Sequence, residues 1–263
     1  MTPSDYEFLR KLLKERSGLD LSPDKQYLVE SRLIPLARRG GLSGISELVQ
    51  KMKAGSTEPL VGEVVEAMTT NETFFFRDKI PFEHLRDTML RELLQARAAR
   101  RALRIWCAAS STGQEPYSIA MCLKEFGAAL SGWRIEILAT DLSQGVLEKS
   151  KAGLFSQFEV QRGLPIQLLV KHFTQTGEMW QVNSDLRAMV AHRQFNLLQD
   201  FSHLGAFDVM LSLTETVLLV AFVGLPKLIQ AAPTTFVLYW SWYFIPASVV
   251  QVSFTVLPDL VVG

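Results

Sequence analysis

The beginning of the chain has the hydrophobic spacing of an amphipathic helix. Leu9 and Leu13 lie four positions apart among charged residues, so the apolar positions share one helical face. Ser4 and Glu7 have the spacing of a capping box at the start of this helix, and Gly18 marks its end. The pattern therefore predicts that the chain begins with a helix that ends before Gly18.

Three further helices are expected in this region. The second begins around Pro23, because proline suits the first helical position, and it is expected to kink near Pro35. Two shorter amphipathic stretches predict helices over residues 45–53 and 60–68. Together they predict a small all-α domain over residues 1–70.

The pattern then changes to an alternation of apolar strands and amphipathic helices. This alternation is typical of a parallel sheet with helices on its faces, so we expect an α/β domain over residues 71–208. Shorter, turn-rich pieces over residues 153–190 predict an inserted β subdomain. Strands are expected at residues 103–108, 134–140, 189–195 and 207–211, and helices at residues 115–129 and 143–151.

The composition changes sharply after residue 208. Only Glu215, Lys227 and Asp259 are charged in the last part of the chain, and residues 228–258 contain no charge. Three explanations stay open for residues 209–263: a reading-frame change in the gene, a genuine membrane tail, or a divergent closing pair of strands. Prolines interrupt the apolar run and count against one clean membrane helix.

Charge and cysteine content limit the partners. The chain has 27 basic and 27 acidic residues, so no net positive charge points to nucleic acid. Cys107 and Cys122 give neither a disulfide framework nor a metal spacing, which favours a reducing, cytoplasmic setting. No metal site is expected, because the four histidines are scattered: His84, His172, His192 and His203.

The stretch RIWCAASSTGQEPYSIAM, residues 104–121, reads as strand, small-residue turn and helix, which brings backbone close to a nucleotide-like ligand. The chain has neither GxGxxG nor GxxxxGK[ST], which argues against dinucleotides and triphosphates. Asp141 follows Gly113 by 28 positions and ends the next strand, where an acid can bind ribose hydroxyls. Glu115 would suit a positively charged ligand such as S-adenosylmethionine. Alternatively, Asp141 caps a helix and Glu115 stabilises a helix N-terminus.

A third candidate cluster is TTNETFFFRD, residues 69–78. Asn71, Thr73 and Arg77 are polar positions that surround three phenylalanines. One explanation is a linker whose aromatic rings anchor the helical domain. That explanation leaves Arg77 without a role, whereas arginine pairs well with a carboxylate such as the one on the methionine part of the ligand.

Four motifs in register resemble the CheR family, the chemotaxis receptor glutamate methyltransferases. They are TTNETFFFRD, WCAASSTGQEPYSIAM, ILATDLS with the following VLEKSKAGLF, and AHRQFNLL, and the resemblance covers about residues 4–208. It implies a Rossmann-like, S-adenosylmethionine-dependent methyltransferase domain after an all-α domain. It also implies that the cofactor is bound by Asn71, Thr73, Arg77, Glu115, Asp141, Asn196 and Leu197.

The resemblance implies a monomer that methylates glutamates in the cytoplasmic domain of a chemotaxis receptor. Lys25, Arg32 and Arg39 recur every seven residues and would dock the acidic receptor, although a solvated helix face would give the same pattern. A carboxylate substrate needs no general base, so no catalytic residue is assigned. In some family members the β subdomain holds a receptor pentapeptide, but the short TQTGEMWQV turn argues against that role here.

The end of the chain departs from the family. After FDVM, residues 207–210, family members continue with Cys-Arg-Asn-Val, whereas this chain continues with LSLTETVLL. If this departure means that the C-terminal part of the family fold is missing, the protein is a catalytically impaired module that binds the receptor or senses the cofactor. This alternative and the active enzyme both stay open.

Overall fold

The computed structural model describes residues 1–55, 58–214 and 217–222, which form two compact units. The first unit contains residues 1–71 together with the short segments 142–144 and 196–199, and the second contains the rest. None of the helices in the described ranges is long and apolar enough to cross a membrane. The first unit corresponds to the expected all-α region, and the second corresponds to the expected α/β region.

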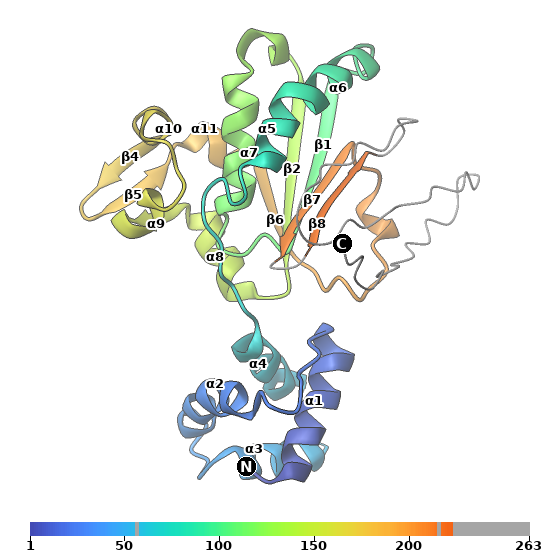
Figure 1. Cartoon of the computed structure of the whole chain (residues 1–263), viewed down its shortest axis with the longest axis vertical. Coiled ribbons are helices and arrows are strands. Elements are labelled where there is room, and N and C mark those ends of the chain that lie inside the picture. Colours follow the sequence, from blue (N-terminus) through green and yellow to red (C-terminus); the bar gives the residue numbers. More distant parts are fainter. Residues whose placement is uncertain (56–57, 215–216, 223–263) are drawn as a thin grey trace, which may run out of the picture. The chain divides into compact units, whose positions relative to one another are not determined.

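The helical unit buries one apolar face of each helix in a common core that includes Leu9, Leu33, Leu48 and Val64. The two shorter helices agree closely with their expected positions. The described residues of this unit form α1 (Pro3–Ser17), α2 (Gln26–Arg39), α3 (Ile45–Lys53) and α4 (Glu58–Met68) (Figure 1).

Both long helices begin at residues other than those expected. In α1 the capping box is formed by Thr2 and Asp5 rather than by Ser4 and Glu7, because Pro3 occupies the first helical position. Gly18 ends this helix in the left-handed conformation, as expected. In α2 the helix begins at Gln26 instead of Pro23, because the intervening residues form a turn. Pro35 lies inside the continuous helix.

The second unit is built around a mixed sheet in the order β6-β2-β1-β7-β8. Four of these strands are parallel, and β8 runs antiparallel to β7. Both faces of the central β1 are buried, as expected for a parallel sheet covered by helices. The strands are β1 (Ala102–Ala108), β2 (Arg134–Asp141), β6 (Val190–Gln194), β7 (Val209–Thr214) and β8 (Val217–Phe222).

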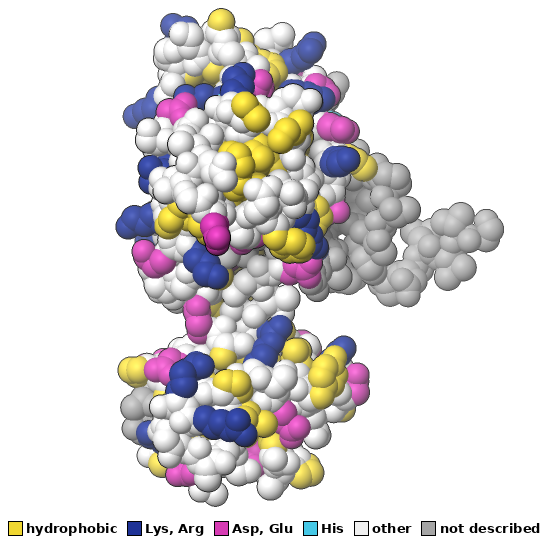
Figure 2. All heavy atoms as spheres, turned by 90° about the vertical axis from the view of Figure 1, so that its left-hand side faces the viewer, with side chains coloured by type: hydrophobic (Ala, Val, Ile, Leu, Met, Phe, Trp, Pro, Cys, Tyr) yellow, Lys and Arg dark blue, Asp and Glu magenta, His cyan; other side chains and the backbone are white. Residues whose placement is uncertain are grey.

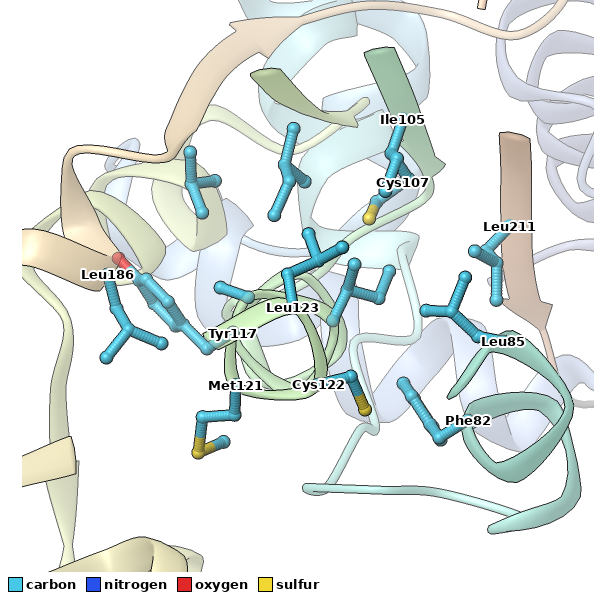
Figure 3. Close-up of a cluster of buried hydrophobic side chains, with 14 of the residues drawn as sticks. Phe82, Leu85, Ile105, Cys107, Tyr117, Met121, Cys122, Leu123, Leu186 and Leu211 are labelled. Atoms are coloured by element: carbon cyan, nitrogen blue, oxygen red, sulfur yellow. The ribbon is translucent and has the colours of Figure 1, made fainter. Parts of the chain in front are cut away.

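The two helices expected in the α/β core, over residues 115–129 and 143–151, correspond to α7 and α8, whereas the helical segments over residues 80–96 were not predicted. Helix α7 covers the face of the sheet that carries Ile105 and Cys107. Its Tyr117 points toward Leu186, whereas Phe82 and Leu85 lie on the other side of the helix, near Cys122 (Figure 3). A second cluster that includes Trp106, Leu138 and Phe207 covers the other face. These helical segments are α5 (Ile80–His84), the π-helical η1 (Leu85–Met89), α6 (Leu90–Ala96), α7 (Gln114–Glu125), the 3₁₀ turns η2 (Gly127–Leu130) and η3 (Ser202–Leu204), and α8 (Gln144–Ala152).

The inserted β subdomain has a three-stranded antiparallel sheet in the order β3-β5-β4. The last two strands form a hairpin whose loop contains Gly177 in a left-handed conformation. Aromatic contacts of Phe155 with Phe75 and Tyr117 tie the insertion to the core. Its elements are β3 (Leu154–Ser156), α9 (Gln157–Gln161), α10 (Ile166–His172), β4 (Phe173–Thr176), β5 (Met179–Val182) and α11 (Ser184–Arg187).

The change of composition after residue 208 falls partly within the described residues. There the chain forms β7 and then β8, an antiparallel pair at one end of the sheet. This is the arrangement expected of a closing strand pair. Residues 223–263 lie outside the described residues, and for them the frame change and the membrane tail stay predictions.

Candidate functional site

The turn between β1 and α7 has an unusual backbone. Ala109 and Ser111 have φ values of 59° and 48°, and Gly113 has a φ of 99°. Left-handed conformations in residues other than glycine cost energy and are concentrated at functional sites. The turn lies at the carboxyl end of β1, where β2 lies on one side of β1 and β7 on the other. Ligands of open α/β sheets bind at this kind of switch point.

Three amide groups of this turn are already used inside the protein. Ser110 N donates to Thr140 O at 2.8 Å, and Gly113 N donates to Ser110 O at 3.1 Å. Ser111 N donates to Asp141 Oδ2 at 2.8 Å. A phosphate-binding loop instead directs its amides at the ligand. The geometry therefore agrees with the missing phosphate motifs and favours a ligand without phosphates.

Asp141 is buried at the carboxyl end of β2, beside the turn. The hydrogen bond from Ser111 N fixes the orientation of its carboxylate. An acid at this strand end suits the pair of ribose hydroxyls of a nucleoside. The structure thus places Asp141 where the sequence predicted a ribose-binding residue.

Glu115 is buried in the first turn of α7, directly after the turn. Its carboxylate lies against the thiol of Cys107 in β1: burial and, to a smaller degree, the charge and hydrogen bonding of Glu115 raise the pKa of that thiol. Cys107 is therefore a neutral core residue. A buried carboxylate beside a ligand pocket favours positively charged ligand groups.

The segment that carries Thr73 and Arg77 is fixed to the same helix. Phe76 N donates to Ser118 Oγ at 3.0 Å, and Ser118 Oγ donates to Gln114 O, next to Glu115, at 2.7 Å. Thr73 and Arg77 thus flank aromatic residues that dock on the first turns of α7.

Two further contacts hold this segment. Phe75 is fully buried against Phe155 and Phe173, so this ring anchors the segment in the α/β unit itself. Gly163, with a φ of 86°, lies so close that an added Cβ would stand 2.0 Å from Phe75 O. Arg77 Nη1 donates to Glu72 O at 3.1 Å, which leaves other donors of the guanidinium for a ligand carboxylate.

The other predicted cofactor residues belong to the helical unit. Asn71 Nδ2 donates to Thr69 Oγ1 at 3.1 Å. Asn196 Nδ2 donates to Arg16 O at 2.7 Å, and its Oδ1 accepts from Leu198 N at 3.0 Å. Leu197 is exposed. The structure therefore groups Thr73, Arg77, Glu115 and Asp141 in one unit, and Asn71, Asn196 and Leu197 in the other.

The three basic residues predicted to dock the receptor have different environments. Lys25 precedes α2, and Arg39 is exposed at its end. Arg32 is half-buried and donates to the carbonyls of Met68, at 2.6 Å, and Thr69, at 3.1 Å. Arg32 therefore compensates backbone carbonyls at the end of α4, a role that the seven-residue spacing did not predict.

The inserted subdomain presents hydrophobic side chains to solvent. Phe158 of α9 and Ile166 and Val170 of α10 are all more than 60% exposed. Figure 2 shows hydrophobic side chains gathered on the face of the molecule that carries this subdomain. Ile166 and Val170 are four residues apart and share one face of their helix.

Sequence reasoning missed two residues beside the turn, Ser150 of α8 and His192 of β6. Ser150 Oγ is hydrogen-bonded to His192 Nε2 at 2.8 Å and packs against Gly113. Both residues lie in motifs that resemble the CheR family, VLEKSKAGLF and AHRQFNLL, and this position was the available signal for them.

These features fit S-adenosylmethionine, which has ribose hydroxyls and positive charge but no phosphate. Buried acids follow β1 and β2, and the amides of the turn are not directed at a phosphate. Comparison with protein-family models decides the identity: residues 4–69 match the all-alpha domain of the CheR methyltransferases, and residues 71–214 match their SAM binding domain. The chain belongs to the CheR methyltransferase family.

Curated relatives agree with this assignment. The chain is 40% identical over 210 residues to the chemotaxis protein methyltransferase Cher2 of Pseudomonas putida, which covers 78% of this chain and 76% of the relative. It is 41% identical over 213 residues to chemotaxis protein methyltransferase 1 of Pseudomonas aeruginosa, covering 79% and 76%. A chemotaxis protein methyltransferase of Vibrio cholerae is 38% identical over 215 residues, covering 80% and 77%.

Family membership confirms the resemblance seen in the sequence, the α/β fold after an all-α domain, and the cofactor. This CheR-family protein is an S-adenosylmethionine-dependent methyltransferase of chemotaxis. The residues that bind the cofactor, and the group that accepts the methyl, are matters of proposal.

Proposed function

We propose that this protein transfers the methyl group of S-adenosylmethionine to glutamate side chains in the cytoplasmic domain of a chemotaxis receptor. The products are glutamate methyl esters and S-adenosylhomocysteine. The observation that carries the proposal is the pair of buried acids, Glu115 and Asp141, beside a turn whose amides are used internally. The two Pseudomonas relatives are chemotaxis protein methyltransferases, which supports a chemotaxis receptor as the substrate.

The α/β unit would hold the cofactor through the residues grouped around the turn. Asp141 accepts hydrogen bonds from the ribose hydroxyls, and Glu115 stabilises the positive charge of the methionine part. Arg77 pairs with the α-carboxylate, with Thr73 beside it. Asn71, Asn196 and Leu197 complete the set that the family resemblance implies.

When bound, the cofactor supplies an electrophilic methyl group on a positively charged sulfur. The receptor carboxylate would accept this methyl group as an ester, and S-adenosylhomocysteine would be released. A glutamate is already ionised at neutral pH, so no base has to remove a proton. The protein contributes orientation and exclusion of water.

The helical unit would contact the receptor. Lys25 and Arg39 are available for an acidic partner, whereas Arg32 also has the structural contacts described above. Exposed ion pairs contribute little individually, so several such contacts have to act together. We further propose that the protein works in the cytoplasm as a monomer, without metal and without nucleic acid.

A methyl-transfer assay tests the proposal. The full chain is incubated with tritiated S-adenosylmethionine and the purified cytoplasmic domain of a chemoreceptor. We expect base-labile label on the receptor, lost when its candidate glutamates are replaced by alanine. Receptor binding without incorporation would support the catalytically impaired module instead.

A matched pair of variants connects the assay to the site. Asp141→Ala should strongly lower incorporation at S-adenosylmethionine concentrations near the KM of the unaltered protein, whereas Asp200→Ala, at an exposed acid of the same unit, should leave it unchanged. Label that is stable to base, or incorporation that Asp141→Ala leaves undiminished, would contradict the proposal.

A further inference from the structure

Gly113 lies in unusually close contact with α8. An added Cβ at Gly113 would stand 2.3 Å from Ser150 Oγ, 2.9 Å from Ser150 Cβ and 3.1 Å from its Cα. Gly113 has a φ of 99° and is the residue from which α7 begins. The side chain of Ser150 thus packs directly against Gly113 at the end of the turn. Gly113 lies two residues before Glu115.

Ser150 is itself held from two other elements. Its Oγ is hydrogen-bonded at 2.8 Å to Nε2 of His192, in the middle of β6. Its carbonyl accepts from Tyr117 Oη of α7 at 2.6 Å and from Gly153 N at 3.0 Å. The side chain therefore has one defined orientation, set by β6.

The same contact joins the three chain segments that carry the candidate cofactor residues. The turn leads into Glu115, α8 follows the strand that ends at Asp141, and β6 leads to Asn196. Burial lowers the pKa of His192, so its ring is neutral around pH 7 and no buried positive charge opposes the contact.

We propose that Ser150, held by His192, is a positioning residue for the cofactor site: it fixes the turn at Gly113 and thereby the carboxylate of Glu115. Neither side chain is assigned a contact with the cofactor. The inference rests on the proposed roles of Glu115 and Asp141. Geometry at this turn matters because small misplacements of binding groups are costly in a preorganised site.

The test compares variants in the full-length protein by calorimetric titration with S-adenosylhomocysteine and by methyl-transfer kinetics. Ser150→Ala and His192→Leu should each weaken binding about three- to tenfold and raise the KM for S-adenosylmethionine, while the KM for the receptor stays unchanged. The double variant should be no worse than the more affected single variant, because both changes break one contact. His192→Gln retains a polar group near the position of Nε2 and should restore most of the affinity.

Tyr117→Phe is the matched structural control. It removes the other side-chain hydrogen bond to Ser150 but leaves the contact with Gly113. It should lower the thermal midpoint without changing affinity for S-adenosylhomocysteine at temperatures where the protein is folded. Equal loss of affinity in Tyr117→Phe and Ser150→Ala would overturn the inference and show general destabilisation.

Asp141→Ala separates this inference from the proposed function. If Asp141→Ala strongly weakens binding while Ser150→Ala binds like the unaltered protein, the positioning role is wrong and the cofactor site stands. If Asp141→Ala binds normally, the site assignment itself is wrong. Additive losses in the Ser150→Ala, His192→Leu double variant would also overturn the inference, because the two residues would then act separately.

Discussion

Functional predictions from sequence fell on two regions: the turn between β1 and α7, which we call the cofactor turn after its proposed role, and α2 with its basic residues, which we call the basic helix. The structure constrains these two regions very differently. At the turn, Ser111, Gly113 and Asp141 are fixed by backbone bonds, burial and close contact. On the helical unit, Arg39 is exposed and Lys25 lies over the exposed ring of Tyr27, whereas Arg32 is used by the backbone of the same unit.

The difference shows what each kind of sequence pattern can establish. A strand, a small-residue turn and a helix leave few conformations, so the neighbours of Asp141 follow from the fold. A seven-residue spacing of charges predicts only that residues lie near one helical face. It does not say whether a guanidinium meets solvent, a partner, or a carbonyl of its own domain.

The largest effect is expected for Gly113→Ala. The new Cβ would clash with Ser150 in a left-handed backbone conformation, at a cost of about 2–6 kcal/mol from strain and overpacking. We expect cofactor binding to be lost by at least about a hundredfold, or the α/β unit to unfold. Titration calorimetry and circular dichroism distinguish these two results.

Gly127→Ala provides the control for that prediction. Gly127 has a φ of 65° shortly after the end of α7, but an added Cβ would have no neighbour within 4 Å. It should cost only the left-handed penalty of about 1–2 kcal/mol and leave affinity unchanged. Similar affinity losses in both variants would mean that the contact with Ser150 is unimportant.

Asp141 variants should have the next largest effect. Asp141→Ala removes the acceptor for Ser111 N and the proposed partner of the ribose, so affinity should fall about ten- to a hundredfold. Asp141→Asn keeps an oxygen acceptor, so its affinity should lie between those of the unaltered protein and Asp141→Ala. Calorimetry with S-adenosylhomocysteine measures both. Tight binding by Asp141→Ala would remove this acid from the site.

The elements and the turn were largely predictable because each depends on local sequence. Strand β2 ends at Asp141 and α3 spans residues 45–53, as the apolar pattern indicated. The errors also have local causes. Because Pro3 is the first helical residue of α1, the capping box is formed by Thr2 and not by Ser4. Residues 23–25 form a turn, so α2 begins later than expected.

The missed parts of the site depend on contacts between residues distant in sequence. Ser150 lies 37 positions after Gly113, and His192 lies 42 positions after Ser150. Ser150 and His192 lie in two of the four family motifs, VLEKSKAGLF and AHRQFNLL, but motif order alone does not show that they meet, because the sheet order brings α8 and β6 to the turn. The bond of Arg32 to carbonyls 68 and 69 likewise depends on how α2 packs on α4.

Variants of Arg32 and Arg39 test whether these two residues of α2 have different roles, one structural and one in docking the receptor. Arg32→Ala leaves the carbonyls of Met68 and Thr69 without their charged donor, at a cost of about 1–3 kcal/mol. We expect faster hydrogen exchange at the end of α4 and, because Asn71 follows directly, a higher KM for S-adenosylmethionine. Arg39→Ala should change neither.

Arg39→Ala should instead raise the KM for the receptor about two- to fivefold, and this difference should disappear at high salt. If Arg32→Ala raises only the receptor KM and leaves exchange in α4 unchanged, the basic helix is one docking face after all.

The smallest effect concerns the acid that caps α1 in the helical unit. Hydrogen bonds from Ser46 Oγ, and then from Thr2, lower the pKa of Asp5 from 3.8 to about 2. The folded state therefore favours the ionised form. The resulting stability is present above pH 3.8 and is lost as the pH falls through 2.

Asp5→Asn should consequently cost about 1 kcal/mol at neutral pH, and the difference from the unaltered chain should shrink between pH 4 and pH 2. Hydrogen exchange of the α1 amides, corrected for intrinsic rates, measures this locally. Asp20→Asn is the control, because Asp20 is exposed and pairs with Lys14 at the surface, away from the cap of α1. A pH-independent difference for Asp5→Asn would show that the cap acts through packing rather than charge, and the helical unit would then resemble the cofactor turn, where contact geometry dominates.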